Sequence, residues 1–497
     1  MDTRIPSLAE NEAMAADLLG REWGLLIDGK ICESHSGARF PVLSPYSESQ
    51  ITSAPNADFH DVDRAVDAAT AAFPGWSGLF GLERAKLIER LADALEAHAA
   101  ELAVLDAVNG GAPITAMFND VAWSAQSLRY FAGLVLEIKG STVPATRNLH
   151  YTERQPYGVV AKIIPFNHPI LFAVRAIASP LVAGNTVILK APDATPLSAL
   201  LLGEIIRDTL PPGVVNILVG EGPALPESLV AHRAIRRIGF TGSEPVGRAI
   251  LRNAAEHAVK NVSLELGGKN ALIAFPDADP TDVASAAIKN MNFLWSGQSC
   301  TSTSRLLVHA DIAEAVVESI REQLSKHVIG NPLDPASEQG TIVNERQYQS
   351  IVTRIANAVE DGATIAVGGG RPEHLTTGLF IEPTVLTNVD PYSRIAQEEV
   401  FGPVLSVITW TDESEAIEIA NSTAYGFTAV IFTNDIKRAH RVARKVEAGL
   451  IGINGSPLAL FALPLGGFKG SGLGSKESCL DELLSYTQEK VVSVALD

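Results

Sequence analysis

Hydrophobic segments typical of strands alternate with helix-like segments along the middle of the chain. Residues 158–164 form an apolar run typical of a buried strand, a helical stretch follows as far as Val182, and residues 186–190 form a second strand-like run. Parallel strands need a crossover of about this length, so the segment predicts a βαβ unit. The alternation continues with a predicted helix at 196–208 and predicted strands at 214–219 and 235–240. Together these elements predict one doubly wound α/β domain.

The alternation restarts after the glycine pair Gly267-Gly268. Further predicted strands lie at 271–275, 305–309, 404–409 and 429–433, with helical segments between them. This pattern predicts a second α/β domain. The last β-prone run, from Tyr486 to Leu496, has nothing after it to pair with. Such a strand joins either a neighbouring subunit's sheet or a sheet of its own subunit, and the sequence leaves both open.

Two helices are predicted nearer the N-terminus. Apolar positions from Val62 to Phe73 follow helical spacing behind Asp61, which is placed to cap the first turn, and Pro74-Gly75 is expected to end this helix. A second helix is predicted from about Leu82 to Leu105. Both are expected to pack beside a sheet.

The composition narrows the class of protein. The chain has 497 residues, 46% of them hydrophobic, which is enough for two to four domains with substantial cores. Its formal net charge of −18 makes nucleic acid and anionic lipid unfavourable partners. Residues 1–16 lack the apolar core of a secretory signal, and the longest apolar runs are shorter than the ~20 residues of a membrane span. We therefore expect a cytoplasmic protein with no nucleic-acid or membrane partner.

Three cysteines, Cys32, Cys300 and Cys479, are far apart and show no CxxC spacing. This arrangement favours neither a disulfide framework nor a zinc site, so no metal is expected. Cys300 lies in the polar, glycine-containing stretch 296–301, a setting that suits an accessible thiolate, although most free cysteines are simply buried. Glu265 ends an apolar strand-like run, where desolvation would raise its pKa toward that of a useful base; a solvent-facing strand end is the alternative.

Two glycine-rich segments invite a phosphate-binding interpretation. The segment 242–247 has the spacing of a phosphate loop, but Arg248-Ala249 stands where a triphosphate-binding loop needs Lys followed by Ser or Thr. Gly220 and Gly222 follow a strand without completing the dinucleotide fingerprint. A helix opening at Ser243 would still present free N–H groups to a pyrophosphate. An ordinary strand-to-helix turn explains the same residues equally well.

Seven ordered segments together carry a resemblance that no single one of them supports. The chain resembles the NAD(P)-dependent aldehyde dehydrogenase superfamily from about Trp23 to Lys490. Because it keeps Glu265, it is most similar to the hydrolytic branch of that superfamily. The segments are Pro165-Phe-Asn-His-Pro169, Gly184-Asn-Thr-Val-Ile-Leu-Lys190, Phe240-Thr-Gly-Ser243, Leu264-Glu-Leu-Gly-Gly-Lys269, Gly297-Gln-Ser-Cys300, Glu398-Glu-Val-Phe-Gly-Pro403 and Pro464-Leu-Gly-Gly-Phe-Lys469.

The resemblance implies roles for three residues. Cys300 would be the nucleophile that attacks the aldehyde carbonyl, Asn167 would donate to the oxyanion, and Glu265 would activate the water that hydrolyses the thioester. A CoA-acylating relative is an alternative, but such enzymes usually lack the deacylating glutamate. A non-enzymatic binding or structural protein on the same fold is a further alternative, although it would have no need of the cysteine and glutamate that this chain keeps.

The resemblance also implies NAD as cofactor. Asp193 stands where a carboxylate accepts from the ribose 2′-OH and repels a 2′-phosphate, so NADP is less favoured. The implied cofactor-binding residues are Ile164, Pro165, Phe166, Lys190, Asp193, Gly222, Phe240, Gly242, Ser243, Val246, Leu266, Glu399 and Phe401.

Substrate residues are harder to assign. Arg175 follows Asn167 by eight positions, where relatives that act on carboxylated or hydroxylated aldehydes also have arginine; pairing with a nearby carboxylate is an equal alternative. Leu465, with Phe461 and small Ala459, leaves room for a bulky or aromatic group. His168 replaces a common aromatic residue of the family.

The expected architecture is α/β, with a Rossmann-like NAD-binding domain (residues 1–133 and 152–268), an α/β catalytic domain (269–468) and a small β oligomerisation element (134–151 and 480–497). The expected partners are a small-molecule aldehyde and further copies of the chain in a homodimer or homotetramer.

Overall fold

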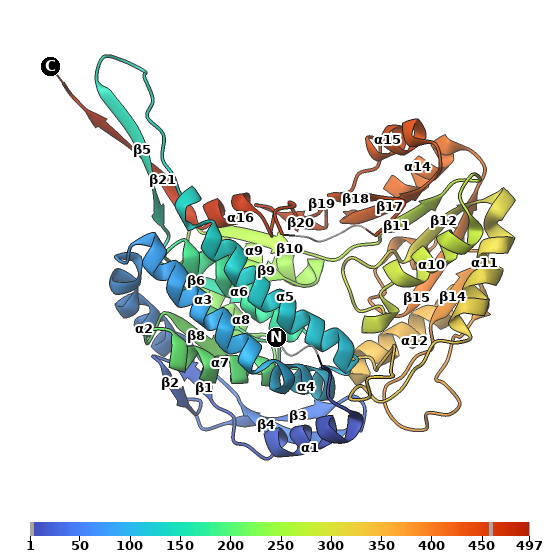
Figure 1. Ribbon diagram of the computed structural model, residues 1–497, viewed down its shortest axis with the longest axis horizontal. Helices are drawn as coiled ribbons and strands as arrows, with labels where there is room; N and C mark the ends of the chain where they lie inside the picture. Colours follow the sequence, from blue (N-terminus) through green and yellow to red (C-terminus); the bar gives the residue numbers. More distant parts are fainter. Residues whose placement is uncertain (1–3, 457–460, 497) are drawn as a thin grey trace.

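The first lobe of the molecule is built on an eight-stranded sheet (Figure 1). The computed structural model describes residues 4–456 and 461–496. The strand order is β2-β1-β8-β7-β6-β9-β10-β20. The five strands β8, β7, β6, β9 and β10 are parallel. β1 pairs antiparallel with β8, β2 pairs antiparallel with β1, and β20 pairs antiparallel with β10. The bounds are β1 Leu25–Ile27, β2 Lys30–Cys32, β6 Val159–Ile163, β7 Thr186–Lys190, β8 Val215–Leu218, β9 Ile235–Thr241, β10 Asn261–Glu265 and β20 Gly472–Leu473. From β6 the chain adds β7 and β8 on one side, and then β9 and β10 on the other side of β6. The change of side lies between β6 and β9, which is the position where doubly wound sheets bind ligands.

Helices cover both faces of this sheet. Five of them, α3 to α7, form layers on one side, while α2, α8 and α9 pack on the other. Their bounds are α2 Phe59–Ser77, α3 Gly81–Ala97, α4 Ala99–Gly110, α5 Ile114–Gly133, α6 Pro169–Val182, α7 Leu197–Thr209, α8 Ala224–Ala231 and α9 Glu244–His257; α1 Leu8–Leu19 and the 3-10 turn η1 Val135–Glu137 lie at the periphery.

Two details of the predicted helices are wrong. The N-cap of α2 is Asp58, which accepts from the N–H of His60 at 2.8 Å, and Asp61 completes a capping box by accepting from the N–H of Asp58 at 3.1 Å. The helix does not end at Pro74-Gly75 but continues to Ser77. The predicted helix 82–105 is two helices that meet at His98, the second of which ends before Gly111 at φ +81°.

The second lobe contains a seven-stranded sheet of order β13-β14-β15-β12-β11-β17-β18, parallel except for β13. Alternate residues of β11 enter different cores: Ile273 packs toward α12, and Leu272 toward α10 and α11. The bounds are β11 Ala271–Ala274, β12 Arg305–His309, β13 Thr364–Val367, β14 Thr384–Thr387, β15 Val404–Trp410, β17 Thr428–Phe432, β18 Leu450–Ile453, α10 Pro280–Asn290, η2 Phe293–Trp295, α11 Ala310–Leu324, α12 Glu345–Glu360, α13 Arg394–Gln397, α14 Glu413–Asn421 and α15 Ile436–Ala443. The predicted α/β class is confirmed.

A two-stranded ribbon projects from the first lobe (Figure 1). It pairs β5 (Leu149–Pro156) antiparallel with β21 (Thr487–Val494), which follows α16 (Leu480–Ser485). The terminal strand therefore has a partner within its own chain, which is one of the two arrangements that the sequence left open. Two short pairs, β3 (Arg39–Ser44) with β4 (Ser49–Pro55) and β16 (Tyr425–Gly426) with β19 (Phe468–Lys469), complete the sheets.

Within residues 4–456 and 461–496, no helix is long and apolar enough to cross a membrane. In the same part of the chain, no group of three or more His, Cys, Asp or Glu side chains is arranged to hold a metal ion.

Candidate active site

The loop that carries Cys300 is folded tightly and fixed from several sides. Ser296, which ends the turn η2, has φ +52° and is followed by Gly297 at φ +68°. The Gln298 side chain accepts from the N–H of Val343 at 3.1 Å, and Asn270 donates to the Cys300 carbonyl at 2.7 Å. These contacts fix the backbone at the cysteine.

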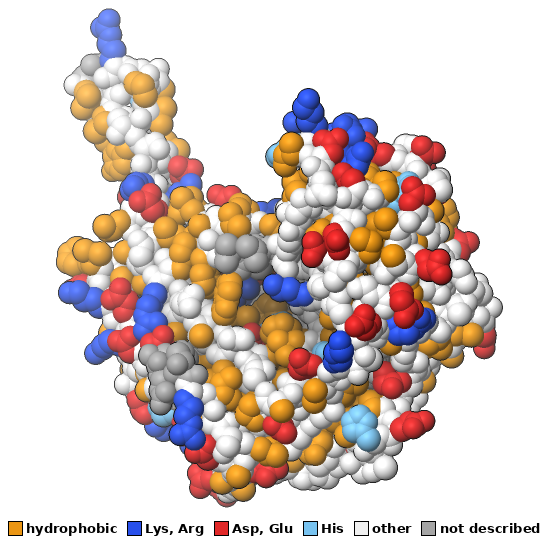
Figure 2. All heavy atoms as spheres, turned by 45° about the vertical axis from the view of Figure 1, so that its right-hand side comes forward, with side chains coloured by type: hydrophobic (Ala, Val, Ile, Leu, Met, Phe, Trp, Pro, Cys, Tyr) orange, Lys and Arg blue, Asp and Glu red, His pale blue; other side chains and the backbone are white. Residues whose placement is uncertain are grey.

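Asn167 reaches this loop from the other lobe. It lies in the connection between β6 and α6, and its Nδ2 donates to the Gln298 carbonyl at 2.9 Å. The two predicted catalytic residues Asn167 and Cys300 therefore come together although they lie on different sheets. Figure 2 shows the surface hollowed between the two lobes, with hydrophobic side chains inside the hollow.

The Cys300 thiol belongs to a side chain that is partly buried. Burial raises its pKa to about 12, and the negative charges of Glu399 and Glu265 act in the same direction. The Cys300 side chain is partly exposed, and an accessible thiolate stays a prediction. The polar residues around Cys300 bond to one another and to the backbone instead of opening the loop to solvent.

Glu265 occupies the end of β10 and is 8% exposed. Its Oε2 is buried without a hydrogen-bond partner, and burial, reinforced by the charge of Glu477, raises its pKa well above 4.5. A side chain at Gly466 would place its Cβ 2.8 Å from Glu265 Oε1, so a glycine is needed for this close approach. The structure thus gives the carboxyl the desolvated setting that the strand pattern predicted, rather than a solvent-facing one.

A second pair of carboxylates lies behind Glu265. Glu482 is buried and accepts from Ser179 Oγ and from the N–H of Ser478, both at 2.6 Å. Arg175 donates to Ser478 Oγ at 2.5 Å and lies 3.6 Å from a Glu477 oxygen. Arg175 therefore pairs with a nearby carboxylate, which is the alternative to substrate binding that the sequence left open.

Sequence reasoning did not select Lys476, Glu477 and Glu482 as site residues. The Lys476 ammonium binds the carbonyls of Gly466 and Gly467, at 2.6 and 2.9 Å, and its charge opposes the rise in the Glu265 pKa. A charged segment such as 476–482 is usually a solvated helix start. Only its packing against α6, some 300 positions earlier, brings it to the site.

The predicted cofactor residues gather at the carboxyl ends of the parallel strands of the first sheet. Lys190 ends β7 and is buried, which lowers its pKa, while the charge of Asp193 opposes that change. Ser243 precedes α9 without a side-chain hydrogen bond to the helix, and Val246 in the first turn is 47% exposed. The N–H groups of that turn are thus left open to an anion.

The remaining predicted cofactor residues line the same edge or face it. They are Ile164, Pro165 and Phe166 after β6, Gly222 (φ +74°) after β8, Phe240 and Gly242 at the end of β9, and Leu266 after β10. Leu266 is fixed by donating its N–H to the Ser471 carbonyl at 2.9 Å.

Glu399 and Phe401 approach that edge from the second lobe. The Glu399 carboxylate accepts from the N–H of Gly268 at 2.9 Å, and any side chain at Gly267 would collide with it. Burial raises the Glu399 pKa. Phe401, with φ +53°, packs edge-on against Phe166 with ring centroids 5.8 Å apart. The Rossmann-like edge and the loop after α13 therefore meet at these four positions.

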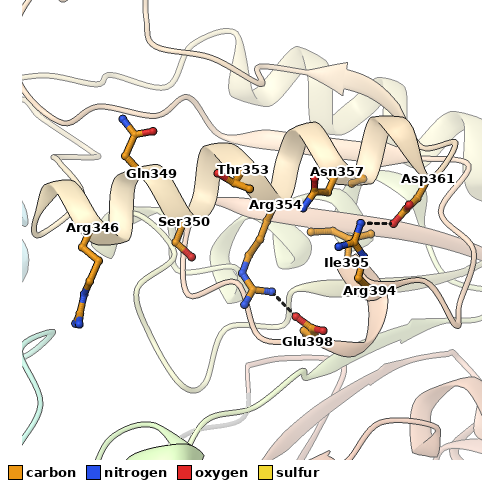
Figure 3. Close-up of a pocket in the computed structure, with 11 residues that line it drawn as sticks. Arg346, Gln349, Ser350, Thr353, Arg354, Asn357, Asp361, Arg394, Ile395 and Glu398 are labelled. Atoms are coloured by element: carbon orange, nitrogen blue, oxygen red, sulfur yellow. Dashed lines mark hydrogen bonds and ion pairs between the residues drawn. The ribbon is translucent and has the colours of Figure 1, made fainter.

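A groove of about 400 Å³ lies next to this loop, between α12 and α13 (Figure 3). Arg354 crosses it to pair with Glu398 at 2.8 Å, and Arg394 pairs with Asp361 at 3.4 Å. None of the predicted site residues lines it.

Aromatic rings surround the predicted substrate side. Phe461 packs against Trp123 and Tyr130 of α5, with ring centroids 5.5 and 5.4 Å apart. Leu465 is buried and donates its N–H to the Glu477 carbonyl at 3.0 Å, which holds it beside the carboxylate cluster. Ala459 lies outside the described residues.

Comparison with known proteins identifies the family. Residues 31–492 match the aldehyde dehydrogenase family. The chain belongs to this family. It is 41% identical to aldehyde dehydrogenase tropH of Talaromyces stipitatus, over 98% of this chain and 96% of that protein. It is 39% identical to retinal dehydrogenase 2 of Rattus norvegicus, over 95% and 92% of the two chains.

Solved structures agree with the sequence match. The NAD+ complex of a Bacillus cereus aldehyde dehydrogenase is 35% identical and superposes with a TM-score of 0.94 over the whole of both chains. The resemblance inferred from the seven motifs is confirmed. As a member of the aldehyde dehydrogenase family, the chain is an oxidoreductase that acts on aldehydes.

Proposed function

We propose that this chain uses NAD to oxidise an aldehyde to a carboxylic acid, through a thioester on Cys300 that water hydrolyses with Glu265 as base. The observation that carries the proposal is the convergence of three groups from two lobes. Asn167 is bonded to the Cys300 loop, and the unpartnered carboxylate of Glu265 acts electrostatically on the Cys300 thiol.

Attack by Cys300 Sγ on the aldehyde carbon creates an oxyanion. The Asn167 amide and the Cys300 backbone N–H are the donors that stabilise it, and a donor of this kind contributes about 3 to 4 kcal/mol to transition-state binding. Because burial disfavours the thiolate, the thiol gives up its proton only as attack proceeds, and solvent water takes that proton at the partly exposed side chain.

Release of the acid requires a base. Glu265 is buried, one of its oxygens has no partner, and its raised pKa places it nearer neutrality than an ordinary carboxyl. It takes a proton from the water that attacks the thioester carbon. The cleaved thiol leaves as Cys300–SH, and the product is the carboxylic acid.

NAD, when bound, accepts the hydride that leaves the oxidised carbon. The uncapped start of α9 at Ser243 fits the pyrophosphate, and the Lys190 and Asp193 pair fits the adenine ribose. Glu399, fixed on Gly268, fits the nicotinamide ribose. The Asp193 carboxylate would repel a 2′-phosphate, so NAD is preferred to NADP.

The substrate is a small-molecule aldehyde, with an aromatic or carboxylated group accommodated beside Phe461, Leu465 and Arg175. The aromatic packing of Phe461 supports the first class. Recognition of a carboxylate would require Arg175 to give up part of its contact with Ser478 and Glu477.

The remaining proposals concern organisation. We assign NAD binding to residues 1–133 and 152–268, catalysis to 269–468, and assembly to 134–151 and 480–497. The projecting β5–β21 ribbon, with Val491 67% exposed, supports its use in a homodimer or homotetramer. The acidic surface and three free cysteines support a cytoplasmic location.

NADH formation tests the proposed reaction. The wild-type chain should oxidise aromatic, aliphatic or ω-carboxylated aldehydes with NAD in the absence of CoA, and Cys300→Ala should abolish turnover while NADH binding persists. Turnover that depends on CoA would assign the chain to the acylating class. Full activity in Cys300→Ala would refute the mechanism.

A further inference from the structure

Helix α6 is buried along its length except for one stripe. Of its residues only Leu171, Phe172 and Arg175 are not fully buried, and the N-cap residue His168 continues the same stripe. Arg175 acts electrostatically on both Glu265 and Cys300, and Asn167, next to His168, is bonded to the Cys300 loop. The stripe therefore borders the reacting groups.

Helix α5 packs against α6. Its residues Asp120, Trp123 and Tyr130 are spaced to lie on one face, and Phe461 packs on the two aromatic rings. The rings of Trp123, Tyr130 and Phe461 therefore cluster on the helix that packs against α6. A polar atom that is unpaired in such surroundings is a candidate for ligand recognition.

His168 presents such an atom. Its Nδ1 lies 2.8 Å from Asp120 Oδ2, and its ring lies 5.0 Å from that of Trp295 and 5.8 Å from that of Phe172, so the imidazole is fixed on three sides. Within the described residues the His168 Nε2 makes no hydrogen bond. It is also not one of the fully buried polar atoms that lack a partner, so a ligand can reach it. Since a carboxylate accepts at Nδ1–H, the neutral ring keeps its lone pair on Nε2.

We propose that His168 determines specificity by accepting a hydrogen bond at Nε2 from a hydroxyl group on an aromatic aldehyde. Asp120 is the positioning residue that holds the ring and its tautomer. The proposal rests on the proposed aldehyde oxidation and names its substrate class. His168 Nε2 is free to contact the substrate, whereas Arg175 is held by Ser478 and Glu477.

The test compares hydroxybenzaldehydes with fluorobenzaldehydes substituted at the same ring position. Fluorine is similar in size but has no proton to donate. For at least one of the 2-, 3- and 4-isomers, wild-type kcat/KM should favour the hydroxyl compound about tenfold, the range of one hydrogen bond. His168→Phe should bring that ratio close to one, and Asp120→Ala should lower it several-fold. If one variant does not fold, the other supplies the same comparison.

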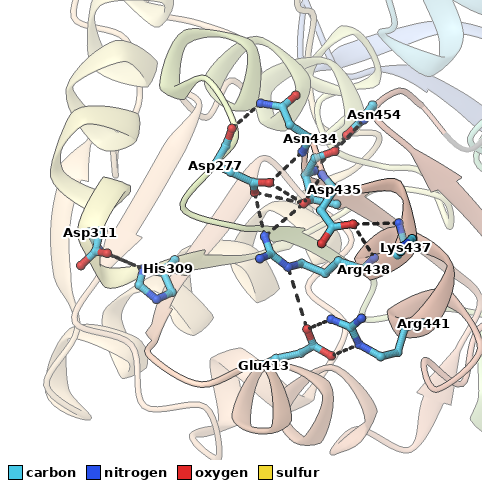
Figure 4. A network of polar contacts seen from close by, with 11 residues as sticks. Asp277, His309, Asp311, Glu413, Asn434, Asp435, Lys437, Arg438, Arg441 and Asn454 are labelled. Carbon is cyan, nitrogen blue, oxygen red and sulfur yellow. Dashed lines mark hydrogen bonds and ion pairs between the residues drawn. The ribbon is translucent and has the colours of Figure 1, made fainter.

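The second lobe offers a matched control. His309 Nδ1 lies 3.5 Å from Asp311 Oδ2 (Figure 4), and its ring packs on Trp410 at 4.8 Å. His309 ends β12, whereas the Cys300 loop precedes the start of that strand. His309→Phe and Asp311→Ala should leave the ratio unchanged. An unaltered ratio in folded His168→Phe, or a wild type without preference for any hydroxyl isomer, would overturn the assignment while aldehyde oxidation itself stands. A wild type that oxidises none of these aldehydes would overturn the reaction as well.

Discussion

The buried carboxylates around Glu265 and the surface network around Asp277 both gather several charges, but they satisfy those charges differently. Asp277 accepts from Thr433 Oγ1 at 3.0 Å, from the N–H of Asn434 at 3.1 Å and from Arg438 at 3.0 Å (Figure 4). Glu265, by contrast, has an oxygen that is buried without a partner.

The difference also appears in the pKa values. The hydrogen bonds from Arg441 hold the pKa of Glu413, at the edge of the outer network, below its usual value. Burial pushes the pKa of Glu265 the opposite way, and it lowers the pKa of the nearby Lys269, whose Nζ is also unpartnered, to about 7. The outer network stabilises the fold, whereas the inner one keeps groups reactive at a cost in stability.

Replacing Glu265 should give the largest effect. Glu265→Gln should lower kcat by about 10² to 10⁴, the usual contribution of a general base. The free energy of unfolding should not fall, because the change removes a buried carboxyl that lacks full compensation. Steady-state kinetics and urea unfolding measure the two quantities. A large loss of stability with little loss of rate would assign Glu265 to the structure instead.

Replacing Asp277 should have the reverse profile. Asp277→Ala removes the acceptor of three hydrogen bonds, one of them from Arg438, and should lower the free energy of unfolding by about 2 to 3 kcal/mol. Turnover by the folded protein at 25 °C should match wild type. Reduced kcat without loss of stability would remove the distinction between the two clusters.

The pH dependence of stability should differ in sign between the clusters. Because the pKa of Glu265 is raised in the folded state, its contribution is full below its unfolded value of about 4.5 and is lost as pH rises through the folded pKa. Glu265→Gln should therefore gain on wild type as pH rises, by at most about 1.4 kcal/mol per pH unit. Urea midpoints from pH 4.5 to 8 measure this, and parallel curves would contradict it.

Glu413→Gln should show the smallest effect. The Arg441 side chain is 48% exposed and that of Glu413 28%, so loss of the pair should cost only about 0.5 to 1 kcal/mol at pH 7. Because the pKa of Glu413 is lowered in the folded state, this difference should disappear as pH falls below about 4.5. A difference that grows toward low pH would reverse the assignment.

The sequence predicted best what depends on continuous hydrophobic runs. The bounds of β7 and β12 match their predicted ranges because each strand has three consecutive apolar residues with one polar residue at either end. The break at His98 was missed because the helical pattern on its two sides is continuous. Glu265 could be selected because a lone carboxylate in an apolar strand is conspicuous.

Contacts between distant segments could not be predicted in this way. The engagement of Arg175 by Ser478 and Glu477 joins residues about 300 positions apart, and no local pattern links them. The contacts that fix the Cys300 loop were missed for a related reason: the polar groups of this loop are satisfied by one another and by Asn270 and Val343 from other segments.

The intact mass of Glu265→Gln after mixing with NAD and benzaldehyde tests the central claim most directly. The account predicts a burst of about one NADH per subunit and a benzoyl adduct on Cys300, with no adduct in the double variant that also carries Cys300→Ala. Sustained turnover without an adduct, in protein that binds NADH normally, would contradict the assignment of Cys300 as nucleophile and Glu265 as base.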